Sequence, residues 1–215
     1  MAGRGAFISF EGIDGAGKSS HVEACAEWLR SQGLTVVLTR EPGGSELAES
    51  IRQLLLTKEM QPETEALLAF AARNDHLDRV IRPALAQGHW VVCDRFTDST
   101  FAYQGGGAGV DRGRLAMLEQ WVHGDLKPDR TYLFDLLPAV AAERRSAVRA
   151  ADRFEAREDT YFDRVRAAYL HREHADPGRF LVVDAGGALE DIRRQVLDDL
   201  AGCLRRWPVA AGGQA

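Results

Sequence analysis

A lysine and two hydroxyl residues directly follow closely spaced glycines near the start of the chain, a combination that suits phosphate binding. Residues 12–19 fit the pattern G-x-x-x-x-G-K-[ST], with an apolar run before them and a helical pattern after them. Glycines let backbone N–H groups turn towards phosphate oxygens, and the N-terminus of the following helix adds positive potential. The pattern predicts a P-loop formed by Gly12, Ile13, Asp14, Gly15, Ala16, Gly17, Lys18 and Ser19.

Within such a loop the two last residues have separate tasks. Lys18 would reach the β- and γ-phosphates of a bound nucleotide, and the Ser19 hydroxyl would ligate Mg²⁺. The competing interpretation, a glycine-rich turn with an exposed lysine, does not account for the strand–loop–helix context.

An acid and an arginine end a second apolar run, residues 90–93. Asp94 occupies the place of a Walker-B aspartate, which holds Mg²⁺ or one of its waters in P-loop proteins. Arg95 presents five donors in a fork that suits bidentate phosphate binding. The alternatives are a simple helix N-cap for Asp94 and a surface ion pair for Arg95.

Five arginines lie within residues 144–157. The transition state of phosphoryl transfer spreads negative charge over several oxygens, and guanidinium groups arriving on closure would stabilise it. The segment therefore predicts an arginine-rich lid over about residues 145–157, which would also exclude water. Any single arginine there could equally lie on a solvated helix face, so we expect two or three of them to act.

Phe70 and Arg73 are spaced i and i+3, which places them on one helix face. A ring beside a guanidinium suits a planar heterocycle with carbonyl acceptors, such as a pyrimidine. Tyr103 and Gln104 add an aromatic hydroxyl and an amide, also compatible with a base and a sugar. On residue type alone, Phe70 could instead be a core residue and Arg73 an exposed charge.

Apolar β-rich runs at residues 6–10, 35–39, 89–93, 131–134 and 180–183 alternate with helical patterns. This alternation is typical of βαβ units and a parallel sheet. We expect an α/β, three-layer P-loop fold, with a five-stranded parallel sheet flanked by helices in one domain over residues 1–215. A frayed tail is expected at about residues 208–215. Ligands in such folds lie beyond the carboxyl ends of the strands.

Local signals predict the helices between these strands. Ser45 is a suitable N-cap for a helix reaching residue 55, and Pro62 suits the first turn of a helix running to about residue 87. Pro83 should kink or end that helix. A glycine-rich segment, 105–109, separates two short helical patterns, and further helices are expected at 139–151, 160–174 and 189–206.

The composition is that of a globular protein, with 215 residues, 45% hydrophobic and 27% charged. A net charge of −5 supplies no basic field for nucleic acid. The three cysteines are too far apart for a metal site, which favours reduced thiols and a cytoplasmic location. No signal peptide is expected, and no apolar run approaches the ~18 residues of a membrane span.

Four motifs together resemble those of bacterial thymidylate kinases, and the resemblance extends from Phe7 to about Trp207. They are FEGIDGAGKS at 10–19, TREPGGS at 39–45, DRFTDSTFAYQG at 94–105 and DRFE at 152–155. The resemblance implies transfer of the γ-phosphoryl group of ATP to dTMP, with Mg²⁺ as cofactor. It also implies a homodimer packed through long helices, of which residues 62–87 are the obvious candidate.

The resemblance further implies roles for individual residues. Asp14 is associated with Mg²⁺ and the dTMP phosphate, Arg95 bridges the two phosphoryl groups, and Arg52 holds the acceptor phosphate. Arg73 addresses the thymine carbonyl. The remaining expected substrate-binding residues are Glu41 in the second motif, Thr100 and Gln104 near the base, and Tyr103 near the sugar.

Two departures from the family pattern affect the expected site. The variable P-loop positions carry no basic residue, so the catalytic arginines should come from the lid, with Arg149 and Arg153 the first choices. The usual thymine-stacking phenylalanine, four residues before the helix arginine, is Ala69 here. Either the helix is rotated so that Phe70 stacks on the base, or stacking is weaker. Phe96 replaces the commoner tyrosine, which removes one hydroxyl.

Two other functions remain as alternatives. The same fold could phosphorylate another nucleotide or a deoxynucleoside. A P-loop switch that hydrolyses nucleotide to change partners is disfavoured, because no N-K-x-D guanine motif follows a strand and because Arg95 is paired with a basic lid.

Overall fold

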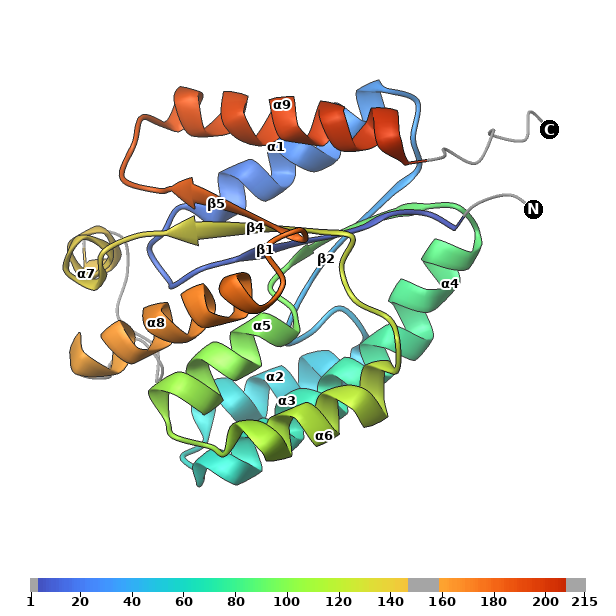
Figure 1. The fold of residues 1–215 in the computed structure, drawn as a ribbon. Coiled ribbons are helices and arrows are strands. Elements are labelled where there is room, and N and C mark those ends of the chain that lie inside the picture. Colours follow the sequence, from blue (N-terminus) through green and yellow to red (C-terminus); the bar gives the residue numbers. More distant parts are fainter. Residues whose placement is uncertain (1–3, 147–158, 208–215) are drawn as a thin grey trace.

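The computed structural model describes residues 4–146 and 159–207, and Figure 1 shows a central sheet covered by helices on both faces. The sheet has five parallel strands in the order β2-β3-β1-β4-β5. The predicted α/β class with a five-stranded parallel sheet is confirmed. The strands are β1 (Phe7–Glu11), β2 (Val36–Arg40), β3 (Trp90–Asp94), β4 (Arg130–Asp135) and β5 (Phe180–Asp184).

Every strand ends one residue later than the apolar runs predict. The added residues are polar, but their backbones continue the ladder: Asp94 pairs in register with Phe10 on one side and with Arg40 on the other. Hydrophobicity reports the burial of side chains, whereas the ladder is made by backbone groups. The polar ends of the strands are therefore held rigidly in the sheet, at the edge where ligands bind.

Two helices cover one face of the sheet, α1 (Lys18–Ser31) and α9 (Leu189–Arg206), and α9 has the predicted bounds. The other face carries α3 (Pro62–His76), α4 (Arg82–Ala86), α6 (Arg112–His123) and α8 (Asp159–Ala175). Helix α2 (Glu46–Thr57) packs on α3, and its N-cap is Ser45, whose hydroxyl accepts from the Ala48 amide as predicted. The short helices α5 (Thr97–Thr100) and α7 (Pro138–Ser146) complete the set.

The helix predicted at 62–87 is divided into three parts. Between α3 and α4 lies a π-helical turn, η1 (Leu77–Ile81). Pro83 has no N–H to donate and its ring would clash with the carbonyl four residues earlier, so a wider turn just before it relieves both problems. The expected kink at Pro83 thus takes the form of a π-turn.

The glycine-rich segment does not separate two helices in the way predicted, because Gly105, Gly106 and Gly107 continue a second π-helix, η2 (Phe101–Gly107). A Cβ on Gly106 would lie 2.8 Å from the Arg164 carbonyl oxygen, so its lack of a side chain lets α8 pack against η2. The chain leaves η2 through Gly109, whose φ is 82°.

The core lies in two main clusters, of which the larger also takes in apolar residues of α8 and the smaller lies between the sheet and α3 and α6. Phe10, Tyr132 and Phe134 lie on the α1–α9 face, while Phe7, Phe70 and Phe96 lie on the α3–α6 face. Across the described ranges, no helix combines the length and apolar character that crossing a membrane requires.

Candidate active site

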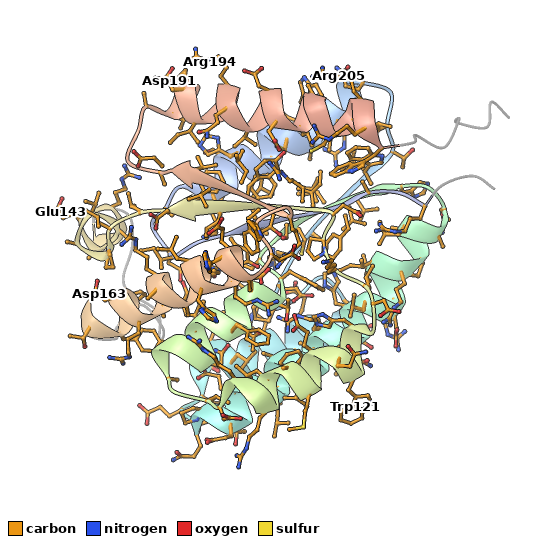
Figure 2. The ribbon with its side chains drawn as sticks, viewed as in Figure 1. Trp121, Glu143, Asp163, Asp191, Arg194 and Arg205 are labelled. Carbon is orange, nitrogen blue, oxygen red and sulfur yellow. The ribbon has the colours of Figure 1, made fainter. Side chains whose placement is uncertain are left out.

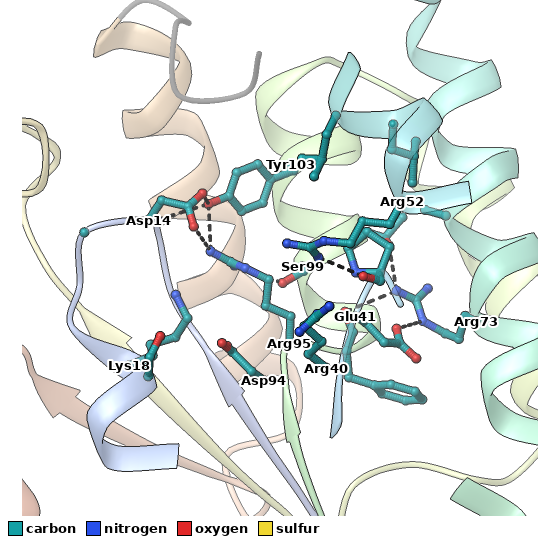
Figure 3. A pocket seen from close by; sticks show the side chains of 18 of the residues that line it. Asp14, Lys18, Arg40, Glu41, Arg52, Arg73, Asp94, Arg95, Ser99 and Tyr103 are labelled. Atoms are coloured by element: carbon teal, nitrogen blue, oxygen red, sulfur yellow. Dashed lines mark hydrogen bonds and ion pairs between the residues drawn. The ribbon is translucent and has the colours of Figure 1, made fainter. Parts of the chain in front are cut away.

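A cavity of about 650 Å³ opens at the carboxyl ends of β1 and β3. These neighbouring strands form a switch point, because the chain leaves β1 towards α1 on one face of the sheet and leaves β3 towards α6 on the other. Such a switch point is where ligands bind in open parallel sheets. The loop after β1 and the loop after β3 therefore face the same space, and Figure 3 shows Lys18 and Asp94 on one side of it and Arg73 on the other.

The P-loop connects β1 to α1 and depends on two of its glycines. Gly12 has a φ of 132°, and a Cβ there would lie 2.3 Å from the Phe134 carbonyl oxygen. Gly17 is the N-cap of α1 in the left-handed conformation, at φ 82° and ψ 19°. These positions need glycine for backbone conformation, so the loop geometry predicted from the sequence follows from its glycine spacing.

Lys18 folds back over this loop. Its Nζ donates to the carbonyl oxygens of Gly12 at 3.0 Å and Ile13 at 3.2 Å, and the side chain is buried. Burial, with the nearby positive charge of Arg95, lowers the pKa of Lys18 to about 8. Both hydrogen-bond partners are neutral carbonyls, and a bound phosphate would give this buried ammonium a direct anionic partner.

Arg95 joins the P-loop to the opposite wall of the cavity. Its Nη1 donates to the Gly12 carbonyl oxygen at 2.8 Å, and its Nη2 donates to Asp14 Oδ1 at 2.6 Å. The same guanidinium also donates to Ser99 Oγ and to the Tyr169 hydroxyl. Arg95 has φ 69°, the only positive φ among the described non-glycine residues. The chain holds this residue in an unfavourable conformation, which is a feature of functional sites.

Asp14 is the anionic partner of Arg95. The Tyr103 hydroxyl donates to Asp14 Oδ2 at 2.8 Å, and Figure 3 shows the ion pair between Arg95 and Asp14. Burial alone would raise the pKa of Asp14, but the charges of Arg95 and Lys18 and the Tyr103 hydrogen bond outweigh it and hold that pKa well below its usual value. Asp14 is therefore ionised at neutral pH.

Glu11, beneath the cavity at the end of β1, is fully buried and was not among the site residues predicted from the sequence. Its Oε1 accepts from the Phe96 amide at 2.7 Å and its Oε2 accepts from Ser99 Oγ at 2.6 Å. Burial and the negative charge of Asp98 raise the pKa of Glu11 to about 7, against the opposing effects of these hydrogen bonds and of Arg95. Glu11 thus anchors two residues that follow Arg95, Phe96 and Ser99, at the start of the segment after β3.

The residues predicted for Mg²⁺ fit a hard cation. Asp94 Oδ1 is buried and has no hydrogen-bond partner in the structure, although an orphaned buried carboxylate oxygen is costly. Ser19 lines the same cavity. Among the described residues, no group of three or more His, Cys, Asp or Glu side chains could hold a metal ion. A cation at Asp94 and Ser19 would thus depend on water and phosphate ligands, as Mg²⁺ commonly does.

The far end of the cavity is organised by a buried carboxylate. Glu41 Oε2 accepts from Arg73 Nε at 2.6 Å, and Glu41 Oε1 lies 3.0 Å from His76 Nδ1. Arg73 Nη2 also donates to Thr100 Oγ1 at 3.0 Å, while its Nη1 is buried without a partner. A lone guanidinium donor at the wall of a cavity suits a ligand carbonyl.

Arg52 is half-buried between these two ends. Its Nη1 donates to the Pro42 carbonyl oxygen at 2.8 Å, and burial, with the charge of Arg40, lowers its pKa. Arg40 lines the cavity as well, and it pairs with Glu49. Two guanidinium groups thus border the space between Arg73 and the P-loop.

The structure does not bring Phe70 to the cavity. Its ring is 2% exposed and packs 5.9 Å, centroid to centroid, from the His123 ring, whereas Ala69 lines the cavity wall. The Arg73 guanidinium carbon lies 4.9 Å from the Phe70 ring centroid. Phe70 therefore supports Arg73 from the side away from the cavity.

Residues 147–157 of the predicted lid, Arg149 and Arg153 among them, lie outside the described residues. Arg144, just before it on α7, lines the cavity and donates to the Ala185 carbonyl oxygen at 2.9 Å. Tyr169 on α8 was missed by sequence reasoning, because nothing in the α8 pattern distinguishes it from a core residue. Ser99 and Glu11 do stand in motifs that the sequence analysis singled out, but their contact with each other could not be read from spacing.

The basic side chains described around the cavity outnumber the acidic ones by six to three. They are Lys18, Arg40, Arg52, Arg73, Arg95 and Arg144, against Asp14, Glu41 and Asp94. A P-loop at one end, an unpaired arginine donor at the other and cations between them define a P-loop phosphotransferase with room for two phosphorylated ligands.

Comparison with known proteins specifies this class further. Residues 10–196 match the family model for thymidylate kinase. The chain is 55% identical over 196 residues to the thymidylate kinase of Burkholderia cenocepacia (strain HI2424), covering 89% of this chain and 95% of that protein. It is 54% identical over 202 residues to that of Burkholderia pseudomallei (strain 1106a), covering 92% and 98%. This chain belongs to the thymidylate kinase family.

A solved structure agrees with this assignment. The crystal structure of thymidylate kinase from Ehrlichia chaffeensis matches with a TM-score of 0.76 and 33% sequence identity, covering 92% of this chain and 99% of that one. The predicted three-layer fold and the resemblance drawn from the four motifs are both confirmed.

Proposed function

We propose that this protein transfers the γ-phosphoryl group of ATP to dTMP, forming dTDP for dTTP synthesis. The observation that carries the proposal is one continuous cavity with the P-loop lysine at one end, the unpaired Arg73 Nη1 at the other, and Arg95 between them. Family membership supports the same reaction.

The donor half is formed by the P-loop and the N-terminus of α1. Backbone amides of residues 12–19 surround the ATP phosphates, and Lys18 exchanges its carbonyl partners for the β- and γ-phosphates. Asp94 and Ser19 would hold Mg²⁺, which when bound neutralises phosphate charge. Lys18 then regains the negative partner that its burial demands.

The acceptor half extends from Arg95 to Arg73. Arg52 holds the phosphate of dTMP, and Arg73 Nη1 donates to a carbonyl of the thymine ring. Thr100 and Gln104 border the base, with Glu41 fixing the orientation of Arg73 through Nε. Tyr103, which donates a hydrogen bond to Asp14, lies beside the sugar of dTMP.

Catalysis in this arrangement consists of positioning and charge neutralisation, because phosphoryl transfer needs little covalent chemistry from the protein. Arg95, already fixed by Asp14, Ser99 and Tyr169, lies between donor and acceptor and neutralises both phosphoryl groups. We assign the remaining cations to the lid arginines, Arg149 and Arg153, since the variable P-loop positions hold none.

An acceptor panel tests the proposal. ADP release is measured with dTMP, dUMP, UMP, CMP, AMP and thymidine as acceptors, and dTMP should be preferred. Preference for another acceptor would support the alternative, a kinase for a different nucleotide or a deoxynucleoside. Substantial ATP turnover without any acceptor would instead support a P-loop switch.

We also propose a homodimer formed through α2, α3 and α6. Large apolar side chains are exposed on these helices, and Figure 2 shows Trp121 projecting away from the protein. Their spacing places Leu47 with Leu54 on one face of α2, and Met117 with Trp121 on one face of α6. A second copy would cover them.

The three cysteines are free and buried, which fits the cytoplasm as location.

A further inference from the structure

A buried carboxylate holds the amide of Gln104. Glu65, in the first turn of α3, is 1% exposed, and its Oε1 accepts from Gln104 Nε2 at 2.7 Å. The two residues come from different elements, α3 and η2, and only Gln104 lines the cavity. The contact therefore joins the cavity wall to a residue behind it.

This contact determines which end of the amide the cavity receives. A carboxylate only accepts hydrogen bonds, so the Gln104 NH₂ group turns towards Glu65. The amide oxygen of Gln104 is then the atom left to accept a hydrogen bond from a ligand in the cavity. Arg73 Nη1, on the same cavity wall, is a donor without a partner. The wall thus offers a donor from Arg73 and an acceptor from Gln104.

A ligand that matches this pair carries a carbonyl next to an N–H. Thymine and uracil present such a pair at C4=O and N3–H, whereas cytosine presents the reverse, an amino group beside an unprotonated ring nitrogen. If the Gln104 amide turned over, its NH₂ group would face the N3 position and would favour cytosine there.

We propose that Glu65 is a specificity-determining positioning residue, which fixes the Gln104 amide so that the site accepts a base with N3–H and rejects cytosine. This inference rests on the proposed function and deepens it. Glu65 does not touch the base; it acts through Gln104.

The test compares three acceptors, dTMP, dUMP and dCMP, in the unmodified enzyme and in Glu65→Gln. Because a glutamine at 65 can donate as well as accept, it releases the Gln104 amide. The kcat/KM ratio of dTMP to dCMP should fall about tenfold, the value of one oriented hydrogen bond in a buried site. The ratio of dTMP to dUMP should not change, since both carry N3–H.

Glu63→Gln is the matched control, because Glu63 lies in the same helix turn but is exposed. Glu65→Asp is a second variant, which keeps the charge but shortens the side chain by one methylene, and it should shift the same ratio. Thermal unfolding verifies that each variant is folded, so that a loss of activity by unfolding is recognised.

The outcomes separate the inference from the function on which it rests. Normal dTMP turnover with an unchanged dTMP-to-dCMP ratio in folded Glu65 variants would overturn the inference alone. An equal loss with all three acceptors would also overturn it, because a merely structural role predicts that result. Absence of dTMP turnover in the unmodified enzyme would overturn the proposed function and the inference with it.

Discussion

Replacing Glu11 by glutamine should make the stability of this protein less dependent on pH. The pKa of Glu11 is raised from 4.5 to about 7 in the folded protein, because the carboxyl is buried and faces Asp98. Between these two values the folded protein binds a proton that the unfolded chain releases, so stability contributed by Glu11 falls as pH rises. Below pH 4.5 the penalty is absent, and above pH 7 it is complete.

The size of the effect follows from the shift. Each pKa unit corresponds to ~1.36 kcal/mol, so a shift from 4.5 to about 7 corresponds to about 3 kcal/mol. Glutamine retains an oxygen to accept from the Phe96 amide, and its NH₂ can donate to Ser99 Oγ, which is free to donate in turn to Tyr169. The variant therefore keeps the shape of the contact and loses the charge.

Urea denaturation from about pH 4 to about pH 8 measures this effect. The free energy of unfolding of Glu11→Gln minus that of the unmodified protein should rise by about 3 kcal/mol across the range, since all other titrating groups cancel in the difference. Glu23→Gln removes an exposed carboxyl on α1 and controls for the change of charge. A Glu11 difference that stays constant with pH would refute the raised pKa and the argument built on it.

Three further perturbations test the site and the assembly. Because burial lowers the pKa of Lys18 to about 8, the Kd for ATP should rise above that pH by up to about tenfold per unit, as ATP binding then requires uptake of a proton; a Kd independent of pH up to 9.5 would contradict this. Asp94→Asn should raise the Mg²⁺ concentration needed for half-maximal activity by about 10- to 100-fold, measured by Mg²⁺ titration, and an unchanged requirement would remove Asp94 from the metal site. Trp121→Arg should shift the mass measured by sedimentation from dimer to monomer. Leu189→Arg, which changes another exposed apolar residue, on α9, should leave the dimer intact. Equal behaviour of the two variants would exclude the α6 face as the interface.

The features that the sequence predicted correctly are those set by neighbouring residues. The P-loop depends on glycine spacing, the Ser45 cap on a hydroxyl three residues before an amide, and the parallel sheet on alternating strand and helix patterns. Asp94 and Arg95 also lie where the strand-end rule places them. Each of these needs only local chemistry and the rule that ligands bind at the carboxyl ends of strands.

The features that the sequence could not predict are set by contacts between distant segments. Whether Phe70 or Ala69 faces the cavity depends on the rotation of α3, which is fixed by packing against His123 on α6. From the sequence, Glu11 is only a polar residue at the end of a strand, since its partners Phe96 and Ser99 come 85 and 88 residues later. Periodicity gives the face of a helix to within about one residue. Here a shift of one residue determines whether alanine or phenylalanine lines the cavity where the acceptor base would bind.

Three unfavourable features lie at or beside Arg95, and they differ in how substrate binding affects them. Arg95 has a positive φ and Glu11 is a buried acid with a raised pKa; both persist when substrates bind, so their cost is a permanent reduction of stability. Lys18 is different, because the phosphates of ATP would restore the charge that its burial disfavours. The free-energy cost of burying the Lys18 ammonium is therefore offset when ATP binds. Substitution at Glu11 should therefore change stability with or without nucleotide, whereas substitution at Lys18 should remove most of the stabilisation that ATP confers.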